Sequence, residues 1–373
     1  MPPTFTPSPL DLAPALGRAV DEERLRTRVD AALARFLDRQ DAVLASISPD
    51  LLPVAAAVRD LLGGGKRLRP AFCYWGWRGA GGDSSDEGAV AACAALELLQ
   101  AGALVHDDLM DRSDTRRGLP SAHRRFEALH ADRGWRGDAA RYGTATAVLL
   151  GDLLLVWCDE LVWDCGLDLA AVRRAKPLFD LMRTEVMAGQ YLELLEPAAP
   201  RPEGAAERAR TVAHYKSAKY TVERPLQIGG LLAAADPALT SGYAAFGLPL
   251  GEAFQLRDDL LGVYGDPAVT GKPTGDDLRE GKRTLLIAET EEHCGGADAR
   301  LLDELLGAPD LDEVRLALLR GVITRSGAPE RVEARIGQLV AEAVAALDQV
   351  PLVDEAARRV LRRLTDAATA RRH

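Results

Sequence analysis

Apolar residues recur at helical spacing along almost the whole chain. The periodicity begins near Asp21 and continues with short breaks to the last residues, whereas few stretches alternate with a period of two. The breaks are three stretches rich in glycine, proline or polar residues, at 79–88, 196–204 and 265–281. This pattern predicts an all-α protein, a helix bundle with mostly short connections.

Composition supports the helical prediction. The 373 residues are 47% hydrophobic and only 5% aromatic, and alanine, leucine and valine supply most of the apolar share. This is enough for a sizeable core, in one large domain or two small ones. We expect a disordered tail over residues 1–20 and a single all-α domain over residues 21–373.

Charge and cysteine content narrow the class of protein. The net charge of −10 argues against nucleic acid as a partner. Five cysteines, with no Cys-x-x-Cys pair, indicate a reduced, cytoplasmic location rather than a disulfide framework. The N-terminus does not have the composition of a signal peptide. The apolar stretch 89–105 contains Glu97 and Gln100, so we expect a buried helix there and no membrane span.

Two acidic clusters are the main candidates for chemistry. Asp107-Asp108-Leu109-Met110-Asp111 and Asp258-Asp259-Leu260-Leu261-Gly262 each end a long apolar helical pattern. Residues i and i+4 share one face of a helix, so Asp107 and Asp111 would present two carboxylates to one point. Carboxylates next to a buried apolar stretch need cations to neutralise them, and Mg²⁺ prefers such ligands.

Basic residues gather in segments near these clusters. Only six of the 46 basic residues are lysines, and four of the six fall in segments that could bind phosphate, which suggests sites that require a compact ammonium group. In chain order, the segments are Gly64-Gly65-Lys66-Arg67-Leu68-Arg69-Pro70, residues 100–118 with Asp114-Thr115-Arg116-Arg117-Gly118 at their end, Tyr215-Lys216-Ser217-Ala218-Lys219, Phe254-Gln255-Leu256-Arg257-Asp258-Asp259, and Gly271-Lys272-Pro273-Thr274-Gly275-Asp276-Asp277.

Taken together, these segments resemble the trans-isoprenyl diphosphate synthases, the polyprenyl synthetase family, from about residue 24 onward. Within this family, the segments are similar to those of the geranylgeranyl diphosphate synthases. The resemblance implies an isoprenoid synthase-type helix bundle around a central cavity. It also implies a Mg²⁺-dependent prenyltransferase that joins isopentenyl diphosphate to an allylic diphosphate, and a homodimer.

The resemblance assigns the first set of ligands. Three Mg²⁺ ions would hold the allylic diphosphate, two of them on Asp107 and Asp111 and the third on Asp258, with Asp108 and Asp259 in support. The remaining contacts to that diphosphate would come from Arg116, Lys216 and Lys272.

A second set of residues matches the family's site for isopentenyl diphosphate, namely Lys66, Arg69, Gln100 and Arg117. Arg67, within the same segment, is expected to be solvated rather than a ligand.

Three more residues, Lys216, Ser217 and Gln255, match positions that flank the carbocation. Lys219 is either part of this site or a helix-surface residue. The departing pyrophosphate can remove the proton itself, so His106 and His123 are as readily structural as catalytic.

One position departs from the family pattern. Many members have aspartate where this chain has Gly262, so the third Mg²⁺ would lose a helper while keeping Asp258. We expect weaker Mg²⁺ affinity without loss of activity.

Product length can be argued from helix geometry. The growing chain should run from Asp107 past Ala103 and Leu99, one and two turns below it at ~5.4 Å per turn. In the family that the chain resembles, an aromatic residue just before the first aspartate closes the tunnel at about fifteen carbons. Gly102 and Ala103 are small, so the resemblance implies geranylgeranyl diphosphate (C20) or a longer product. Trp157 or Trp163 could help to close the tunnel, although core packing explains both equally well.

Several alternatives remain open on the sequence. They are a farnesyl or longer-chain polyprenyl diphosphate synthase, a class I terpene cyclase, a non-catalytic partner subunit, and an irregular prenyl coupling on the same fold. The cyclase is less favoured because it binds no second diphosphate and would not need the Lys66 segment. The partner subunit is less favoured because the acidic clusters are almost complete.

Overall fold

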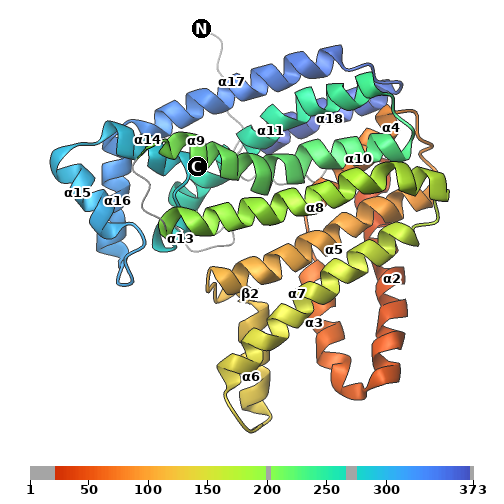
Figure 1. Ribbon diagram of the computed structural model, residues 1–373, viewed down its shortest axis with the longest axis horizontal. Helices are drawn as coiled ribbons and strands as arrows, with labels where there is room; N and C mark the ends of the chain where they lie inside the picture. Colours follow the sequence, from red (N-terminus) through yellow and green to blue (C-terminus); the bar gives the residue numbers. More distant parts are fainter. Residues whose placement is uncertain (1–21, 199–202, 266–274, 370–373) are drawn as a thin grey trace, which may run out of the picture. The chain divides into compact units, whose positions relative to one another are not determined.

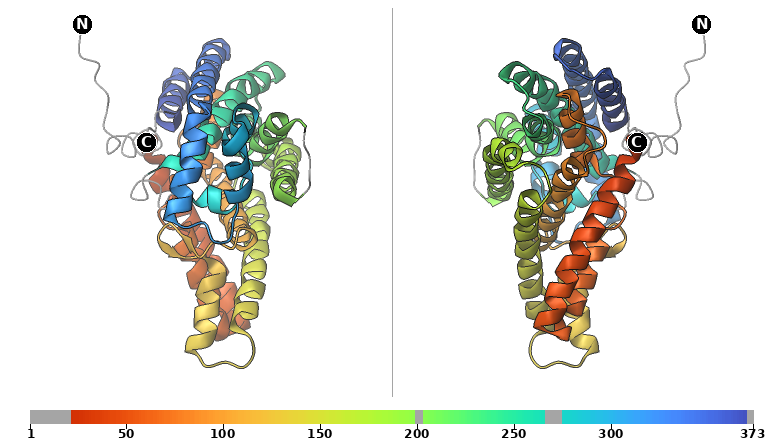
Figure 2. Two further views of the ribbon diagram at one scale, coloured as in Figure 1. Left: turned by 90° about the vertical axis from the view of Figure 1, so that its left-hand side faces the viewer. Right: turned by 90° about the vertical axis from the view of Figure 1, so that its right-hand side faces the viewer.

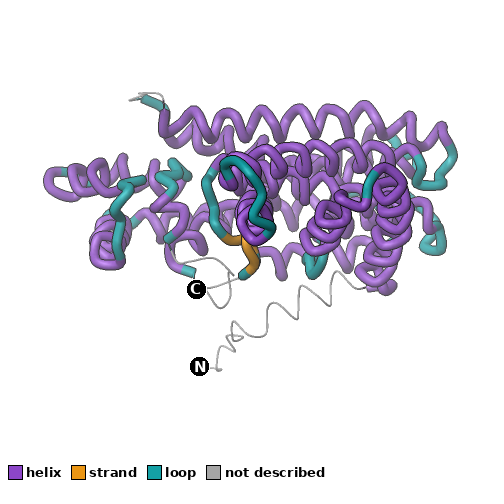
Figure 3. The backbone as a smooth tube through the Cα atoms, turned by 90° about the horizontal axis from the view of Figure 1, so that it is seen from below, coloured by secondary structure: helices purple, strands orange, loops and turns teal. Residues whose placement is uncertain are grey.

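The computed structural model describes residues 22–198, 203–265 and 275–369, and nearly all of them are helical (Figure 1). Within these ranges, the strands are the two short segments of one hairpin (Figure 3). The all-α prediction is therefore confirmed. The predicted disordered tail lies outside the described residues.

The described residues form two compact units, and each is considered by itself. The N-terminal unit contains residues 22–74 and 82–173, and the C-terminal unit contains residues 75–81 and 174–369. A single domain over residues 21–373 stays a prediction.

The N-terminal unit holds the first helices and the hairpin. Its elements are η2 (Glu22–Arg24), α2 (Leu25–Ile47), η3 (Pro49–Leu51), α3 (Leu52–Leu62), most of α4 (Leu68–Gly79), α5 (Glu87–Met110), β1 (Thr115–Arg116), β2 (Leu119–Pro120), α6 (Ala122–Asp132), α7 (Ala139–Trp163) and the first turn of α8 (Leu169–Ala198).

The C-terminal unit holds the remaining helices. Its elements are the rest of α8, α9 (Ala205–Val212), the π-helix η4 (Ala213–Glu223), α10 (Arg224–Leu232), α11 (Pro237–Tyr264), α13 (Asp276–Arg279), α14 (Leu285–His293), α15 (Gly296–Leu305), α16 (Glu313–Arg325), α17 (Ala328–Gln349) and α18 (Glu355–Thr369).

Helix α5 is the core of the N-terminal unit and packs against α2 and α7. It begins where the carboxylate of Asp86 accepts hydrogen bonds from the Gly88 and Ala89 amides, which would otherwise be unpaired. A side chain on Gly102 would place its Cβ 3.1 Å from the Gly151 carbonyl oxygen, so the small residue lets α5 and α7 approach closely. Helix α6 lies beside α7 and is joined to it by a loop (Figure 2).

The apolar helix that we expected to be buried is α5. It is the one described helix that is long and apolar enough to cross a membrane, but 72% of its most apolar 18-residue window is buried inside the chain. Burial of this kind is typical of a core helix, so α5 is weak evidence for a membrane span.

Helix α11 is central to the C-terminal unit, where it packs against α17, η4 and α10. It starts after Asp236, which accepts a hydrogen bond from the Leu239 amide, with Pro237 at its first position. The second acidic cluster, Asp258 and Asp259, lies near the C-terminal end of this helix.

The π-helix η4 is held close to its neighbours by glycines. A Cβ on Gly189 of α8 would collide with the backbone of Lys216. On α11, a Cβ on Gly251 would lie 2.6 Å from Ala218 Cα, and one on Gly247 would lie 2.8 Å from Glu223 Cα. Only residues without a Cβ permit these contacts, so glycines on two helices fix the backbone that carries Lys216.

The predicted connections agree with the described ones in part. The break at 79–88 separates α4 from α5, but α8 continues two residues past the predicted start of the second break, to Ala198. The third break contains the one-turn helix α13, which is too short to produce a periodic pattern.

The glycine contacts predict the effect of a single methyl group. Gly251→Ala should lower the free energy of unfolding by about 1–3 kcal/mol, because its methyl group overlaps the Ala218 backbone. Gly337→Ala is the matched control, since a Cβ there meets no atom within 4 Å, and it should raise stability by up to about 1 kcal/mol. Urea denaturation of both variants measures the difference, and equal stability of the two would contradict the packing argument.

Candidate active site

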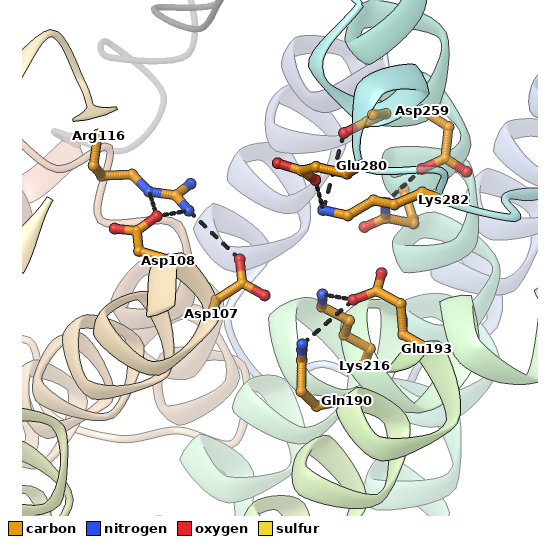
Figure 4. A network of polar contacts seen from close by, with 11 residues as sticks. Asp107, Asp108, Arg116, Gln190, Glu193, Lys216, Asp259, Glu280 and Lys282 are labelled. Atoms are coloured by element: carbon orange, nitrogen blue, oxygen red, sulfur yellow. Dashed lines mark hydrogen bonds and ion pairs between the residues drawn. The ribbon is translucent and has the colours of Figure 1, made fainter. Parts of the chain in front are cut away.

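The first acidic cluster lies at the C-terminal end of α5 in the N-terminal unit (Figure 4). Asp107 and Asp108 belong to the last helical turn, and Asp111 caps it by donating its amide to the Asp107 carbonyl. The Asp108 side chain is only 2% exposed and the Asp107 side chain 16%. Carboxylates at this end oppose the helix dipole, so they need positive partners.

Arg116 supplies such a partner from the β1–β2 hairpin. Its Nε donates to Asp108 Oδ1 at 2.8 Å, and its Nη2 lies 3.5 Å from Asp107 Oδ2 (Figure 4). Burial lowers the pKa of Arg116, but the hydrogen bond to Asp108 and the charges of Asp107, Asp108 and Asp111 outweigh it and raise the pKa. The guanidinium therefore stays charged beside the cluster.

The hairpin turn explains how Arg116 and Arg117 are placed. Thr115 pairs with Pro120 and Arg116 with Leu119, which leaves Arg117 and Gly118 as the two turn residues. Their φ angles are 53° and 76°, the left-handed conformations that a tight type I′ hairpin requires. Arg117 donates from Nη1 to the Gly63 carbonyl oxygen at 3.2 Å, so it reaches the loop that carries Lys66.

The loop between α3 and α4 exposes Lys66 and buries Arg67. Our prediction that Arg67 is solvated is wrong: the residue is 5% exposed and bonded to Glu97 and Asp30. Arg69 is partly buried in the first turn of α4, and Gln100 is partly buried on α5. The four residues proposed for isopentenyl diphosphate thus all belong to the N-terminal unit.

The second acidic cluster lies near the C-terminal end of α11. Gln255 donates from Nε2 to Asp259 Oδ1 at 2.7 Å, and Asp258 is more exposed than Asp259. Burial raises the pKa of Asp259 to about 8, against the hydrogen bond from Gln255, which lowers it. The carboxylates of Asp277, Asp258 and Glu193 add to the increase. This part of the C-terminal unit therefore carries a concentration of negative charge.

Lys216 is held beside that charge. It forms an ion pair with Glu193 of α8, which also accepts a hydrogen bond from Gln190 at 3.4 Å (Figure 4). Ser217 follows Lys216 in the same π-helix. π-helical turns occur frequently at functional sites, because the wider turn presents side chains and carbonyls that an α-helix would hide.

The sequence left open whether Lys219 is part of the site or a helix-surface residue, and its contacts argue against the surface. Its Nζ donates to Glu185 Oε1 at 2.9 Å and lies 4.8 Å from the centre of the Tyr215 ring. The side chain is only 18% exposed, so Lys219 is not a solvated surface residue.

Gly262, the departure in the second motif, faces a carboxylate. A Cβ on Gly262 would collide with the Asp277 side chain, so that side chain fills the space next to the glycine. Lys282 Nζ lies 4.0 Å from Asp277 Oδ1. The same Nζ lies 2.7 Å from Glu280 Oε2 (Figure 4). The missing carboxylate of the motif is thus matched by one from α13. Lys272 lies outside the described residues.

The residues discussed for product length occupy different surroundings. Leu99 is fully buried, and Gly102 faces α7 rather than an open space. Trp157 packs edge-on against Phe36 with ring centres 6.1 Å apart, which is core packing. Trp163 is half exposed within the chain. Ala103 is the partly buried small residue one turn below Asp107.

Both histidines near the first cluster have structural contacts. The His106 ring packs over Gly151, with Nε2 3.2 Å from the Val148 carbonyl oxygen. His123 is buried and has Nδ1 3.2 Å from the Ser121 hydroxyl. These contacts favour a structural role for each.

Sequence reasoning missed Glu193 and Asp277 as members of the C-terminal cluster. A weak indication was available for Glu193, because Gln190 and Glu193 are three residues apart on an apolar helix. Asp277 ends the basic segment 271–277, but only the fold places its side chain against Gly262.

The donor set fits a divalent cation. Hard cations such as Mg²⁺ take carboxylate oxygens, and both units offer several of them near buried helix ends. Burial is the main cause of the raised pKa of Asp259, and the neighbouring carboxylates add to it; a bound cation would oppose both effects.

Comparison with known proteins first defines the class. A solved geranylgeranyl pyrophosphate synthase from Corynebacterium glutamicum, complexed with isoprenyl diphosphate and magnesium, superposes with a TM-score of 0.88 at 40% identity, covering 93% of this chain and 98% of that one. The fold is accordingly that of the helical isoprenoid synthases.

The family follows from a sequence match. The polyprenyl synthetase family model matches residues 53–318, so the chain belongs to the polyprenyl synthetase family. The geranylfarnesyl diphosphate synthase of Aeropyrum pernix is 32% identical over 86% of this chain and 94% of its own. The (2E,6E)-farnesyl diphosphate synthase of Mycobacterium tuberculosis is 31% identical over 79% of this chain and 76% of its own. The resemblance seen in the motifs is confirmed, and the chain is a prenyltransferase.

The charge around Asp259 predicts a stability change that does not depend on activity. An aspartate whose pKa is raised stabilises the fold when protonated, so this contribution is lost as the pH rises from about 4 to about 8. Asp259→Asn mimics the protonated form and should raise the melting temperature by about 2 °C or more at pH 8 in EDTA. Added Mg²⁺ should then stabilise the variant less than the native chain.

The control for this measurement is Asp298→Asn. The hydrogen bond from Arg325 lowers the pKa of that exposed carboxylate, so its removal should not raise the melting temperature or alter the response to Mg²⁺. A lower melting temperature for Asp259→Asn in EDTA would contradict the repulsion argument.

Proposed function

We propose that this chain is a magnesium-dependent trans-prenyltransferase that condenses isopentenyl diphosphate with an allylic diphosphate, head to tail. The product is geranylgeranyl diphosphate or a longer chain. The observation that carries the proposal is the end of α5, where Asp107 and Asp108 contact Arg116 on a hairpin whose next residue, Arg117, bonds the Lys66 loop. These contacts support the proposal because the aspartates proposed for metal and the arginines proposed for the two diphosphates are neighbours in one unit.

The allylic diphosphate is assigned to the acidic clusters. Three Mg²⁺ ions, when bound, supply positive charge that stabilises the leaving diphosphate. Asp107 and Asp111 would hold two of the ions and Asp258 the third, with Asp108 and Asp259 in support. Asp277, which fills the space beside Gly262, adds a carboxylate there. We therefore propose that the change to glycine weakens the third metal site less than the sequence suggested.

The basic residues orient the allylic diphosphate for ionisation. Arg116, Lys216 and Lys272 donate to its oxygens as the carbon–oxygen bond breaks and pyrophosphate leaves with the electron pair. Ser217 and Gln255 face the allylic cation with a hydroxyl and an amide, dipoles that stabilise positive charge without forming a covalent bond to it.

The second substrate completes the reaction. Lys66, Arg69, Gln100 and Arg117 bind the diphosphate of isopentenyl diphosphate, whose double bond attacks the cation and forms the new carbon–carbon bond. The adjacent carbon then loses a proton to the departed pyrophosphate, which restores a double bond. No histidine is required, in agreement with the structural contacts of His106 and His123.

Relatives of this chain differ in product length, so the length of its own product is the finer part of the proposal. Synthases named for farnesyl, geranylgeranyl and geranylfarnesyl products all resemble the chain. Because Gly102 faces α7, Ala103 is the residue we assign to the product path below Asp107. A methyl group there leaves room for a chain longer than C15.

A homodimer is proposed on the basis of an exposed apolar face. Leu149, Val156 and Trp163 are spaced seven residues apart on α7 and are 68%, 63% and 46% exposed in the single chain. A second copy that covers this face would remove a large apolar area from water. Sedimentation velocity at micromolar concentration tests this, and a monomer would contradict it.

A cytoplasmic location stays a prediction. All five cysteines lie in the described part of the chain and are free thiols, which fits a reducing compartment.

A direct assay tests the reaction. The purified chain is incubated with Mg²⁺, isopentenyl diphosphate and each of the C5, C10 and C15 allylic diphosphates, and the products are separated by chromatography. We expect a C20 or longer product and a fall of at least about 100-fold in kcat for Asp107→Ala, since a metal ligand is lost. Absence of product with every allylic substrate would overturn the proposal.

A substitution tests the product path. Ala103→Phe should shorten the main product to C15 or less, because an aromatic ring one turn below Asp107 closes the path. The control is Val314→Phe on α16, where the valine is 69% exposed, and it should leave the product unchanged. If Ala103→Phe is active and its product has the native length, the path runs elsewhere.

A further inference from the structure

The buried guanidinium of Arg67 is a part of the Lys66 loop that the proposed mechanism does not use. Its Nη1 donates to Glu97 Oε2 at 2.6 Å, and its Nε donates to Asp30 Oδ1 at 2.8 Å. Its Nη2 donates to the carbonyl oxygen of Leu62, the last residue of α3, at 2.6 Å. One side chain therefore ties the loop to α2, α3 and α5 at once.

The loop backbone rests directly on this ion pair. A Cβ on Gly65 would lie 2.7 Å from Arg67 Nη1 and 3.0 Å from Glu97 Oε2, so a side chain there would displace the ion pair. Arg67 itself has a φ of 56°, a left-handed conformation that costs free energy in a residue with a side chain. Its carbonyl then accepts the Ala71 amide as α4 begins. Lys66 is thus fixed between two constrained neighbours.

The same pair is linked to the other proposed diphosphate ligands. Glu97 lies three residues before Gln100, on the same face of α5. Burial lowers the pKa of Arg117; the charge of Glu97 opposes this, and the charges of Arg67 and Arg116 add to it, so the pair interacts electrostatically with Arg117. Arg117 also donates to Gly63 at the start of the loop.

Net stability is a weak reason for this pair to be charged. Buried ion pairs contribute little net stability compared with apolar residues of similar size, because both charges must leave water. In some proteins, a buried polar or charged group instead selects one geometry among several. The geometry selected here directs Lys66 outward while Arg67 points inward.

We propose that Arg67 and Glu97 are positioning residues for the diphosphate of isopentenyl diphosphate. The pair fixes the 63–67 loop so that Lys66, Arg69 and Arg117 converge on that diphosphate, and it does not touch the ligand. The inference rests on the proposed function and deepens it at one of its two substrate sites.

Steady-state kinetics with each substrate varied separately tests the inference. Arg67→Gln should raise the KM for isopentenyl diphosphate about tenfold or more, while the KM for the allylic diphosphate stays within about twofold and kcat within about threefold. Arg67→Lys keeps the charge but cannot make all three hydrogen bonds of the guanidinium, so it should raise the KM for isopentenyl diphosphate by a smaller factor. The control Arg39→Gln removes an exposed pair, Nη2 to Asp164 Oδ2 at 2.7 Å, and should leave both KM values unchanged.

Each outcome decides the inference. An unchanged KM for isopentenyl diphosphate in folded Arg67→Gln overturns it, as does an equal rise of both KM values, which would indicate general loosening of the fold. If Arg67→Gln does not fold, the near-isosteric Glu97→Gln takes its place with the same criteria. Failure of both to fold would show that the pair only stabilises the unit, and the inference would fall.

The test separates this inference from the proposed function. Turnover by the native chain decides the function before any variant is compared. Should the native chain give no product, calorimetric titration with isopentenyl diphosphate still measures its binding to the native chain and to Arg67→Gln. Equal affinities would overturn the positioning role independently of catalysis.

Discussion

The burial of neighbouring carboxylates at helix ends is the constraint on which the proposed site depends. The ends of α5 and α11 are apolar on most sides, yet each carries aspartates that a solvated surface would accommodate more readily. At α5 the charge is met by Arg116, and at α11 burial and neighbouring acids push the pKa of Asp259 to about 8. Such an arrangement is stable in its ionised form only when cations are supplied. Metal and substrate binding are in this sense part of the energetics of the native state.

Close packing at glycines fixes the position of the backbone that carries charged residues of the proposed site. Glycines at 189, 247 and 251 let α8 and α11 contact the backbone of the π-helix that carries Lys216. Gly65 lies against the side chains of the Arg67–Glu97 pair, which a Cβ would crowd. In both places, side chains that we propose as ligands are positioned by contacts made at glycines. The position of a basic side chain in the fold, and not its residue type alone, therefore decides whether it is available to bind phosphate.

The sequence predicted the helical class, the family and the two acidic helix ends, because these follow from periodicity and from contiguous motifs. It did not predict that Arg67 is buried, since Lys66, Arg67 and Arg69 are equally basic and only the fold places Glu97 and Asp30 below the loop. It also gave no reason to separate Gly102 from Ala103. One faces α7 and the other lies below Asp107, a difference set by helix packing. Asp277 beside Gly262 depends on a contact across fifteen residues that no local pattern encodes.

The two-residue hairpin turn fixes how its two arginines lie relative to each other. Arg116 and Arg117 are joined by one planar peptide bond inside a tight turn, with Arg116 on the aspartates and Arg117 on the Gly63 carbonyl. The backbone leaves little freedom between these two neighbours. The spacing between the acidic helix end and the 63–67 loop is therefore set by the turn conformation and not only by the side chains.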